Sequence, residues 1–383
     1  MTPSKQLAAP TVSSALTISR IETIPIRVPL GRVYRGSHYH MTHRSTIVTR
    51  IHTEQGIVGE AYAGDEDAGL FEIDRIVHDE IAPRLLGADG LAIERCWELA
   101  RPATFDILRD RRLGLVACAC VDAALWDAVG KLVDQPLWRL WGGYADSVPM
   151  ISIGGYYDSP VSIAEEVEGL RERGLAGMKF KVGGLDAEAD AKRFREARAA
   201  AGPDFALAAD ANQGWTREQA IAFARAVEDC DVLWFEEPCR WHNDRRAMAD
   251  VRAMAGIPVA AGQSEYSAGG CRDLMTAGAI DWCNFDASWS GGPTEWRRVA
   301  AMATAFDVRM GHHEEPQVSS HLLASIPHGG YAECFDPDRD PIWWNLVANR
   351  PPLIGGRIAL PTRPGLGWEL DEDYIARYRV SSP

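Results

Sequence analysis

The chain of 383 residues is long enough for a large barrel or two domains, and its composition, 46% hydrophobic and 25% charged, is typical of a globular protein. A formal net charge of -14 argues against nucleic acid or an anionic membrane surface as a partner. Eight cysteines without a Cys-x-x-Cys pair indicate buried thiols in a reducing compartment, so we expect a cytoplasmic protein. Residues 1–17 lack a signal-peptide pattern and are expected to form a flexible tail, and no apolar run is predicted to span a membrane.

The first predicted domain covers residues 18–145 and mixes strands with helices. Apolar and polar residues alternate over 21–28 and again over 45–51, as they do in half-buried strands. A polar loop is predicted between them at 31–44, and helices are predicted at 74–85, 93–99 and 115–132. These elements indicate an α+β capping domain with a small meander of strands.

A different rhythm begins near residue 148, where short apolar runs alternate with amphipathic stretches. The predicted strands are 149–153, 177–182, 205–210, 232–236, 257–261, 282–286, 308–312 and 331–335, with helices between them, for example at 186–200, 217–228 and 294–305. Eight strands alternating with helices predict an α/β barrel of the TIM type over residues 146–350. The Pro- and Gly-rich segment 351–383, with a strand-like piece at 357–360, is expected to return to the first domain.

Lysine is scarce in this chain, and two of its five lysines stand together at Lys179 and Lys181. At a spacing of two on a strand both side chains point to the same side, and each is expected to lower the pKa of the other. A neutral lysine can act as a base, which arginine cannot do. The pair therefore indicates an active site at the end of the second barrel strand, although a charged strand edge would show the same pattern.

Polar residues also end most of the other predicted barrel strands, where barrel enzymes carry their chemistry. In chain order these are Asp210 and Asn212, Glu236, Gln263 and Glu265, Asp286, His312 and His313, and Glu333. Carboxylates on three consecutive strands would repel one another unless a hard divalent cation with oxygen ligands were bound between them. We therefore expect a metal site at the mouth of the barrel.

This order of residues resembles that of the enolase superfamily, and more closely its mandelate racemase subgroup, over nearly the whole chain. The resemblance implies a modified (β/α)7β barrel, an N-terminal α+β capping domain completed by the C-terminal segment, and Mg²⁺ as cofactor. By this resemblance Lys179 pairs with the substrate carboxylate and Lys181 acts as the base. Asp286 and His313 form a catalytic dyad, and Glu333 is an electrophilic acid. The metal ligands that the resemblance implies are Asp210 and Glu236.

Two positions depart from the family pattern. The third metal ligand is usually a Glu that follows Gly at the end of the fifth strand, and here that position is Gln263. Glu265 faces the same side if the strand continues, so we expect it to supply the missing carboxylate, with Gln263 as an alternative ligand or a substrate contact. A role for Glu265 as the cap of the next helix stays open.

The second departure is the doubled histidine. Spacing along the chain favours His313 over His312 as the dyad histidine.

The resemblance implies removal of the α-proton of a small carboxylate substrate to give an enediolate, with Lys181 or His313 as the base. We favour dehydration of an acid sugar to a 2-keto-3-deoxy acid, because the predicted loop at 31–44 is rich in hydrogen-bonding side chains. The residues expected to bind substrate are Arg35, His38, Tyr39, Asn212, Gln263 and His312. A racemase or epimerase of a 2-hydroxy acid and a non-catalytic acid-sugar-binding relative are the alternatives, and a homo-oligomer is expected.

Overall fold

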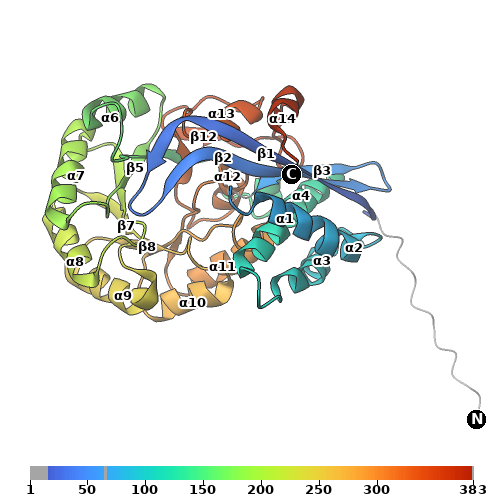
Figure 1. Ribbon diagram of the computed structural model, residues 1–383, viewed down its shortest axis with the longest axis horizontal. Coiled ribbons are helices and arrows are strands. Elements are labelled where there is room, and N and C mark those ends of the chain that lie inside the picture. The colour runs from blue at the N-terminus through green and yellow to red at the C-terminus, as the bar shows by residue number, and fades with distance from the viewer. Residues whose placement is uncertain (1–15, 64–66, 382–383) are drawn as a thin grey trace, which may run out of the picture.

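The computed structural model describes residues 16–63 and 67–381, so most of the predicted tail at 1–17 lies outside the described residues. Within them the chain forms a cap, built mainly from its first third, and a barrel that follows it (Figure 1). The barrel helices curve around one side of the molecule, and a long hairpin reaches from the cap across the barrel (Figure 1).

The cap combines a three-stranded antiparallel sheet with a layer of helices. Its strands are β1 (Ile18–Arg35), β2 (His40–Thr53) and β3 (Val58–Ala63), paired in the order β1-β2-β3. Its helical segments are α1 (Leu70–Ile76), the π-helical turn η1 (Val77–Ile81), α2 (Ala82–Leu85), α3 (Ile93–Ala100), the 3-10 turn η2 (Arg101–Thr104), α4 (Arg111–Leu132) and α5 (Leu137–Leu140). These helices cover one face of the sheet, mainly through the contacts of α4 with β2 and β3. The alternation predicted for a half-buried strand over 45–51 is not seen, because residues 45–49 of β2 are all buried.

Helix α4 is the central element of the cap. Asp110 caps its first turn by accepting a hydrogen bond from the backbone N–H of Arg112. Among the described helices it is the one that is long and apolar enough to cross a membrane, with a mean hydropathy of 1.6, which the sequence analysis missed. Because 89% of its most apolar window is buried inside the protein, α4 is a core helix.

The predicted loop at 31–44 is mostly strand, which corrects the sequence prediction. β1 continues to Arg35 and β2 begins at His40, so that Tyr34 lies opposite Met41 and only residues 36–39 connect the strands. A register shift between Pro29 and Tyr34 interrupts the regular pairing. The segment lacks a regular apolar–polar alternation, so the sequence pattern did not identify it as strand.

The barrel region, all of whose residues are described, alternates strands and helices as the sequence predicts. Its strands are β4 (Ser147–Gly154), β5 (Gly177–Lys181), β6 (Ala206–Asp210), β7 (Val232–Glu236), β8 (Val259–Ala261), β9 (Trp282–Cys283), β10 (Arg309–Met310) and β11 (Ala332–Phe335). The helices between them are α6 (Ile163–Glu172), α7 (Ala187–Ala201), α8 (Arg217–Ala226), α9 (Asp244–Ala255) after the short turn η3 (Trp241–Asn243), α10 (Ala268–Thr276), α11 (Pro293–Thr304) and α12 (Pro316–Ala324).

The eight strands are parallel and lie in the order β10-β9-β8-β7-β6-β5-β4-β11. A single parallel bridge between Met310 and Gly329 joins the two ends of this path, beside β10 and just before β11. Eight strands with seven intervening helices make the predicted (β/α)7β barrel. Its interior is filled by Ile151, Ala208, Trp234, Ala260 and Trp282, so it is a packed core and its chemistry must lie at the strand ends.

The C-terminal segment contacts both parts of the protein. After α13 (Pro341–Leu346), β12 (Arg357–Ala359) pairs antiparallel with the start of β4. The chain then returns to the cap, where Leu366 donates its backbone N–H to Asp127 of α4. Beyond α14 (Glu372–Tyr378), Arg379 bridges to Ile26 of β1.

Candidate active site

Three neighbouring strands place a lysine and two carboxylates side by side at the barrel mouth. Lys181 at the end of β5 is paired in register with Asp210 at the end of β6, and Asp210 is paired with Glu236 at the end of β7. All three side chains are at least 97% buried. Parallel pairing without a slip at these positions therefore brings together the residues that the sequence separates by 55 positions.

The two lysines bind different sets of acceptors. Lys179 Nζ donates to Glu236 Oε1 at 2.6 Å and lies 2.7 Å from Glu333 Oε1 on β11. Lys181 Nζ donates to Asp210 Oδ2 at 2.7 Å and to Asn212 Oδ1 at 2.9 Å. The two lysines of β5 thus connect the carboxylates of β6 and β7 to that of β11.

The expected lowering of the lysine pKa values is wrong for this arrangement. Burial lowers the pKa of Lys179, but the ion pairs with Glu236, Glu333 and Asp210 outweigh both burial and the neighbouring ammonium of Lys181. Burial likewise lowers the pKa of Lys181, and Asp210 is the main group that raises it well above its ordinary value. The carboxylates on adjacent strands, which spacing within β5 does not reveal, decide the outcome.

The structure gives Glu265 a different partner from the predicted metal site. Its Oε1 accepts a hydrogen bond from Arg245 Nη2 at 2.7 Å, and its Oε2 lies against Gly270 in the first turn of α10. Strand β8 ends at Ala261, and Gly262 has a φ of +140°, so the chain turns before residue 265. The prediction that Glu265 faces the metal site is therefore contradicted, because its condition, a continuing strand, is not met.

Gln263, the alternative ligand, has a buried amide oxygen that is available to a cation. The residue is 8% exposed, and its Oε1 has no hydrogen-bond partner among the described residues. Within residues 16–63 and 67–381, no three His, Cys, Asp or Glu side chains are grouped as a metal site. Two carboxylates and one amide oxygen are a donor set that fits a hard divalent cation such as Mg²⁺.

Asp286 and His313 form the predicted pair. His313 Nδ1 lies 2.8 Å from Asp286 Oδ2, while Asp286 Oδ1 accepts hydrogen bonds from the hydroxyl of Ser288 at 2.6 Å and from its backbone N–H at 2.7 Å. The ring of Trp289 packs on the imidazole, with the ring centres 4.8 Å apart. Asp286 is thus fixed by its own turn and in turn fixes the orientation of the histidine.

A second acidic residue, to which the sequence alone assigned no role, contacts the other side of the His313 ring. His313 Nε2 lies 3.2 Å from Oε1 of Glu314, whose backbone is left-handed with a φ of +52°. Burial lowers the pKa of His313, but the carboxylates of Glu314 and Asp286 more than offset this and raise it to about 10. These two carboxylates therefore favour the imidazolium form of His313, the form that can donate a proton.

The cap holds Glu314 through Arg44 of β2. Arg44 is 2% exposed and donates to Glu314 Oε2 at 2.8 Å and to Glu315 Oε1 at 3.1 Å, and its Nε lies 3.3 Å from Asp340. The two doubled residues His312-His313 and Glu314-Glu315 were visible in the sequence. Their partner in the cap was not, because 270 residues separate Arg44 from Glu314.

His312 does not face the site, which corrects its predicted role in substrate binding. Its Nε2 accepts a hydrogen bond from the backbone N–H of Ala287 at 3.0 Å, and its Nδ1 lies 2.8 Å from the carbonyl oxygen of His313. Burial lowers the pKa of His312, so the ring is neutral. Alternate side chains point to opposite sides, and of the two histidines His313 is the one turned toward Asp286.

The hairpin residues predicted to bind substrate are not equivalent in the structure. The ring of Tyr39 lies 5.8 Å from Lys181 Nζ, so it covers the lysine end of the site. Arg35 has a side chain that is 60% exposed and lies 3.8 Å from Asp158 of the barrel, and His38 is exposed. Tyr39 is therefore the hairpin residue that the structure brings to the catalytic lysine.

The fold and these residues define a capped barrel enzyme with acid–base groups on two sides of a carboxylate cluster. The family described as the N-terminal domain of mandelate racemase and muconate lactonizing enzyme matches residues 21–142. The family described as enolase C-terminal domain-like matches residues 162–374. The chain therefore belongs to the enolase superfamily, in its mandelate racemase group.

Solved and curated relatives extend over nearly the whole chain. A mandelate racemase/muconate lactonizing enzyme from a marine actinobacterium, crystallised with magnesium, is 60% identical, covers 96% of this chain and 100% of its own, and superposes with a TM-score of 0.92. The 3,6-anhydro-alpha-L-galactonate cycloisomerase of Streptomyces coelicolor is 30% identical over 95% of this chain and 99% of its own. The L-talarate/galactarate dehydratase of Salmonella typhimurium is 30% identical over 95% and 92%.

Proposed function

We propose that this protein is an Mg²⁺-dependent dehydratase that converts an acid sugar to a 2-keto-3-deoxy acid. The observation that carries this proposal is the His313 imidazole held between Asp286, at 2.8 Å, and Glu314, at 3.2 Å. Dehydration requires an acid that can protonate a leaving hydroxyl, and an imidazolium with a pKa of about 10 is such a group at neutral pH. Relatives that include a sugar-diacid dehydratase support the same reaction class.

The carboxylate cluster is the proposed binding site for the cation and the substrate carboxylate. Asp210, Glu236 and Gln263 would hold Mg²⁺, and Lys179 would contribute a second positive charge beside the substrate carboxylate. The bound cation supplies positive charge that stabilises an enediolate and weakens the hold of Asp210 on the proton of Lys181. Glu333, bonded to Lys179, fixes that ammonium in place.

Lys181 is the proposed base that removes the α-proton. Its Nζ is held by Asp210 and Asn212 and lies beneath the ring of Tyr39, which limits the access of water. Around the closed barrel, β5 and β10 are separated by β4 and β11 on one side. Lys181 therefore acts from one side of the cluster, and His313, which follows β10, acts from the other.

A panel of mono- and dicarboxylic sugar acids, assayed for 2-keto products with and without Mg²⁺, tests this function. We expect Mg²⁺-dependent product from at least one acid, and a loss of roughly 10³-fold or more in kcat for Lys181→Met and for His313→Asn. Lys192→Met, at an exposed lysine of α7, is the matched control and should retain activity. Full activity in both site variants, or no effect of Mg²⁺, would contradict the proposed roles.

Racemisation or epimerisation is the second candidate, because Lys181 and His313 stand on two sides of the cluster. If no hydroxyl leaves, a proton returned from the opposite side inverts the α-carbon. Exchange of the α-proton with deuterium from solvent, without a 2-keto product, would identify this outcome. A protein that binds acid sugars but shows neither exchange nor product would be the non-catalytic relative.

The setting of the enzyme is part of the same proposal. We propose a cytoplasmic location, because the eight cysteines of the chain are all free and buried. We also propose a homo-oligomer, which sedimentation of the purified protein would test.

A further inference from the structure

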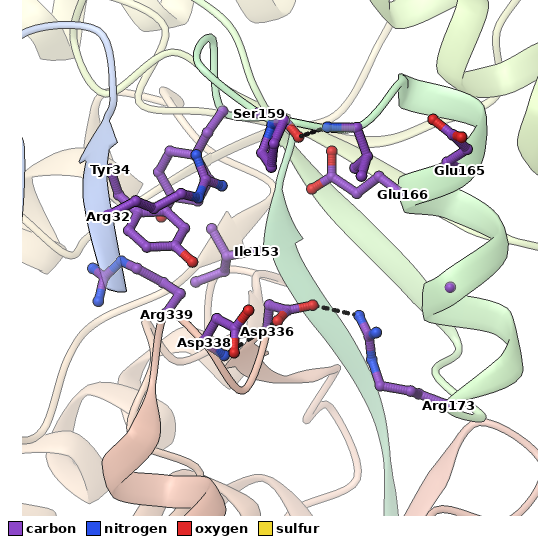
Figure 2. Close-up of a pocket in the computed structure, with 14 residues that line it drawn as sticks. Arg32, Tyr34, Ile153, Ser159, Glu165, Glu166, Arg173, Asp336, Asp338 and Arg339 are labelled. Atoms are coloured by element: carbon purple, nitrogen blue, oxygen red, sulfur yellow. Dashed lines mark hydrogen bonds and ion pairs between the residues drawn. The ribbon is translucent and has the colours of Figure 1, made fainter. Parts of the chain in front are cut away.

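A cavity of about 330 Å³ lies beside the barrel mouth, between the hairpin, the start of α6 and the loop that follows β11 (Figure 2). Arg32 and Tyr34 reach it from β1, Tyr156 from the loop after β4, and Arg339 from the loop after β11. The residues assigned above to the metal and to proton transfer do not line it. The cavity therefore has no role in the mechanism described so far.

Arg339 is the unusual group in this cavity. It is 2% exposed, yet its Nε and Nη1 have no hydrogen-bond partner, and Nη2 donates to the Sδ of Met41 at 2.6 Å. Figure 2 shows its side chain directed toward the strand that carries Tyr34 and away from Asp336. The guanidinium lies over the ring of Phe335, 4.2 Å from its centre, and its charge acts on Glu314. Neither contact gives Nε and Nη1 an acceptor, and buried donors without an acceptor are costly, so they call for a ligand that accepts from them.

The other charged groups of the cavity have partners of their own. Arg173 pairs with Asp336 at 2.6 Å, and Arg32 donates to the carbonyl oxygen of Asp158 at 2.9 Å. On the α6 side, Glu166 accepts from the backbone N–H of Gly155, and Glu165 from Ser162 in a capping box. Asp338 lies on the same loop after β11 as Arg339 and adds negative charge to that part of the cavity (Figure 2). Of the three arginines that line this cavity, Arg339 is the one with buried donors that find no acceptor among the described residues.

Tyr156 connects this cavity to the catalytic lysine. It is 5% exposed, and its hydroxyl is also without a hydrogen-bond partner. Burial raises the pKa of Tyr156, and the groups that act on it electrostatically are Tyr39, Arg339, Lys181 and Glu314. Tyr156 packs edge-on against Tyr34, with the ring centres 5.3 Å apart, and Ile153, another residue of the cavity lining, is paired in register with Lys179. The cavity therefore adjoins the strand that carries both catalytic lysines.

We infer that Arg339 and Tyr156 form a subsite for a second carboxylate of the substrate, which makes the preferred substrate a dicarboxylic sugar acid. This inference rests on the proposed function and narrows its substrate class. The first carboxylate lies at Asp210, Glu236 and Lys179, and the second accepts hydrogen bonds from Arg339. The Tyr156 hydroxyl donates to the second carboxylate or to a hydroxyl of the chain. A monocarboxylic sugar acid leaves the guanidinium unpaired.

Calorimetric binding tests the subsite without depending on turnover. Six-carbon sugar diacids and monoacids of matched configuration are titrated, with Mg²⁺ present, into the wild type, Arg339→Gln and Arg173→Gln. We expect the wild type to prefer a diacid, and Arg339→Gln to weaken diacid binding roughly 100-fold while changing monoacid binding little. Arg173→Gln, which removes a paired arginine of the same cavity, should change neither. Where an acid is turned over, kcat/KM should follow the same pattern.

Three results would overturn the subsite. They are a wild type that binds monoacids as tightly as diacids, an Arg339→Gln variant that loses both equally, and one that loses neither. If Arg339→Gln does not fold by circular dichroism, Arg339→Lys, which keeps the charge, replaces it and should lose selectivity for diacids by a smaller factor. Turnover of monoacids alone would refute the subsite and leave the dehydratase standing. Diacid binding through Arg339 without Mg²⁺-dependent turnover would refute the dehydratase and leave the subsite standing.

Discussion

The contact between His313 and Glu314 predicts a pH-dependent contribution to the free energy of unfolding, which can be measured without substrate. Glu314→Gln keeps the size of the side chain and an oxygen that can accept from Arg44, but removes the negative charge 3.2 Å from His313 Nε2. The pKa of His313 is about 10, against an ordinary value of 6.5. At 1.36 kcal/mol for each pH unit, the imidazolium stabilises the folded protein by roughly 5 kcal/mol.

The charge of Glu314 is the first of the groups that raise this pKa, so we assign it roughly half of the effect, about 2–3 kcal/mol. Because the folded pKa lies above the unfolded one, this stability is fully present below pH 6.5. It is lost as the pH rises through 10. The lowered pKa of Glu314 reports the same contact from the other partner, so it is not counted again.

Urea unfolding at a series of pH values from 6 to 10.5 measures the effect. We expect Glu314→Gln to lose about 2–3 kcal/mol near pH 6.5 relative to the wild type, and this difference to shrink toward pH 10.5. In a His313→Asn background the same substitution should give a difference independent of pH. A constant difference between wild type and Glu314→Gln over the whole range would refute the reasoning.

Further predictions concern the metal site and the contact between cap and barrel. Gln263→Glu should tighten Mg²⁺ binding by roughly tenfold in a calorimetric titration because it adds a carboxylate to the donor set, and weaker binding would count against Gln263 as a ligand. Glu265→Gln should leave Mg²⁺ affinity unchanged but lower the free energy of unfolding by about 1 kcal/mol, because Arg245 loses its ion pair; a large loss of affinity would restore Glu265 as a ligand. Arg44→Met should cost about 3–5 kcal/mol in the same unfolding assay, because it leaves buried carboxylates without a counter-ion, and a cost below 1 kcal/mol would contradict this role.

The places where the sequence prediction failed share one cause. Period-two reasoning placed Glu265 beside the metal ligands, but β8 ends at Ala261 and a turn follows, so the period no longer applies. The same limit applies to the segment 31–44, which was predicted as a loop. There β1 and β2 continue as strands, and a register shift interrupts their pairing. In both places the error lies where a regular element ends or is interrupted, which local pattern does not locate.

The electrostatics of the site could not be read from neighbours in the chain. Lys179 and Lys181 are adjacent on β5 and would lower each other's pKa if they were alone. Their carboxylate partners stand on β6, β7 and β11 and reverse that expectation. Arg339, with unpartnered donors that point to a second substrate carboxylate, carried no signal in the sequence at all.

The sequence by itself determined the barrel and the residues at its mouth. Alternation of apolar strands with amphipathic helices is local, and the ends of parallel strands must meet at one edge, so the strand-end residues Asp210 and Glu236 could be placed from order. The pairing of Asp286 with His313, and the choice of His313 over His312, came from the family resemblance. Only the tertiary structure decided which groups touch: Arg245 on Glu265, Glu314 on His313, and Arg44 of the cap on Glu314. The physical reason is that pKa values and ligand geometry depend on distances of a few ångströms between strands, which sequence separation does not encode.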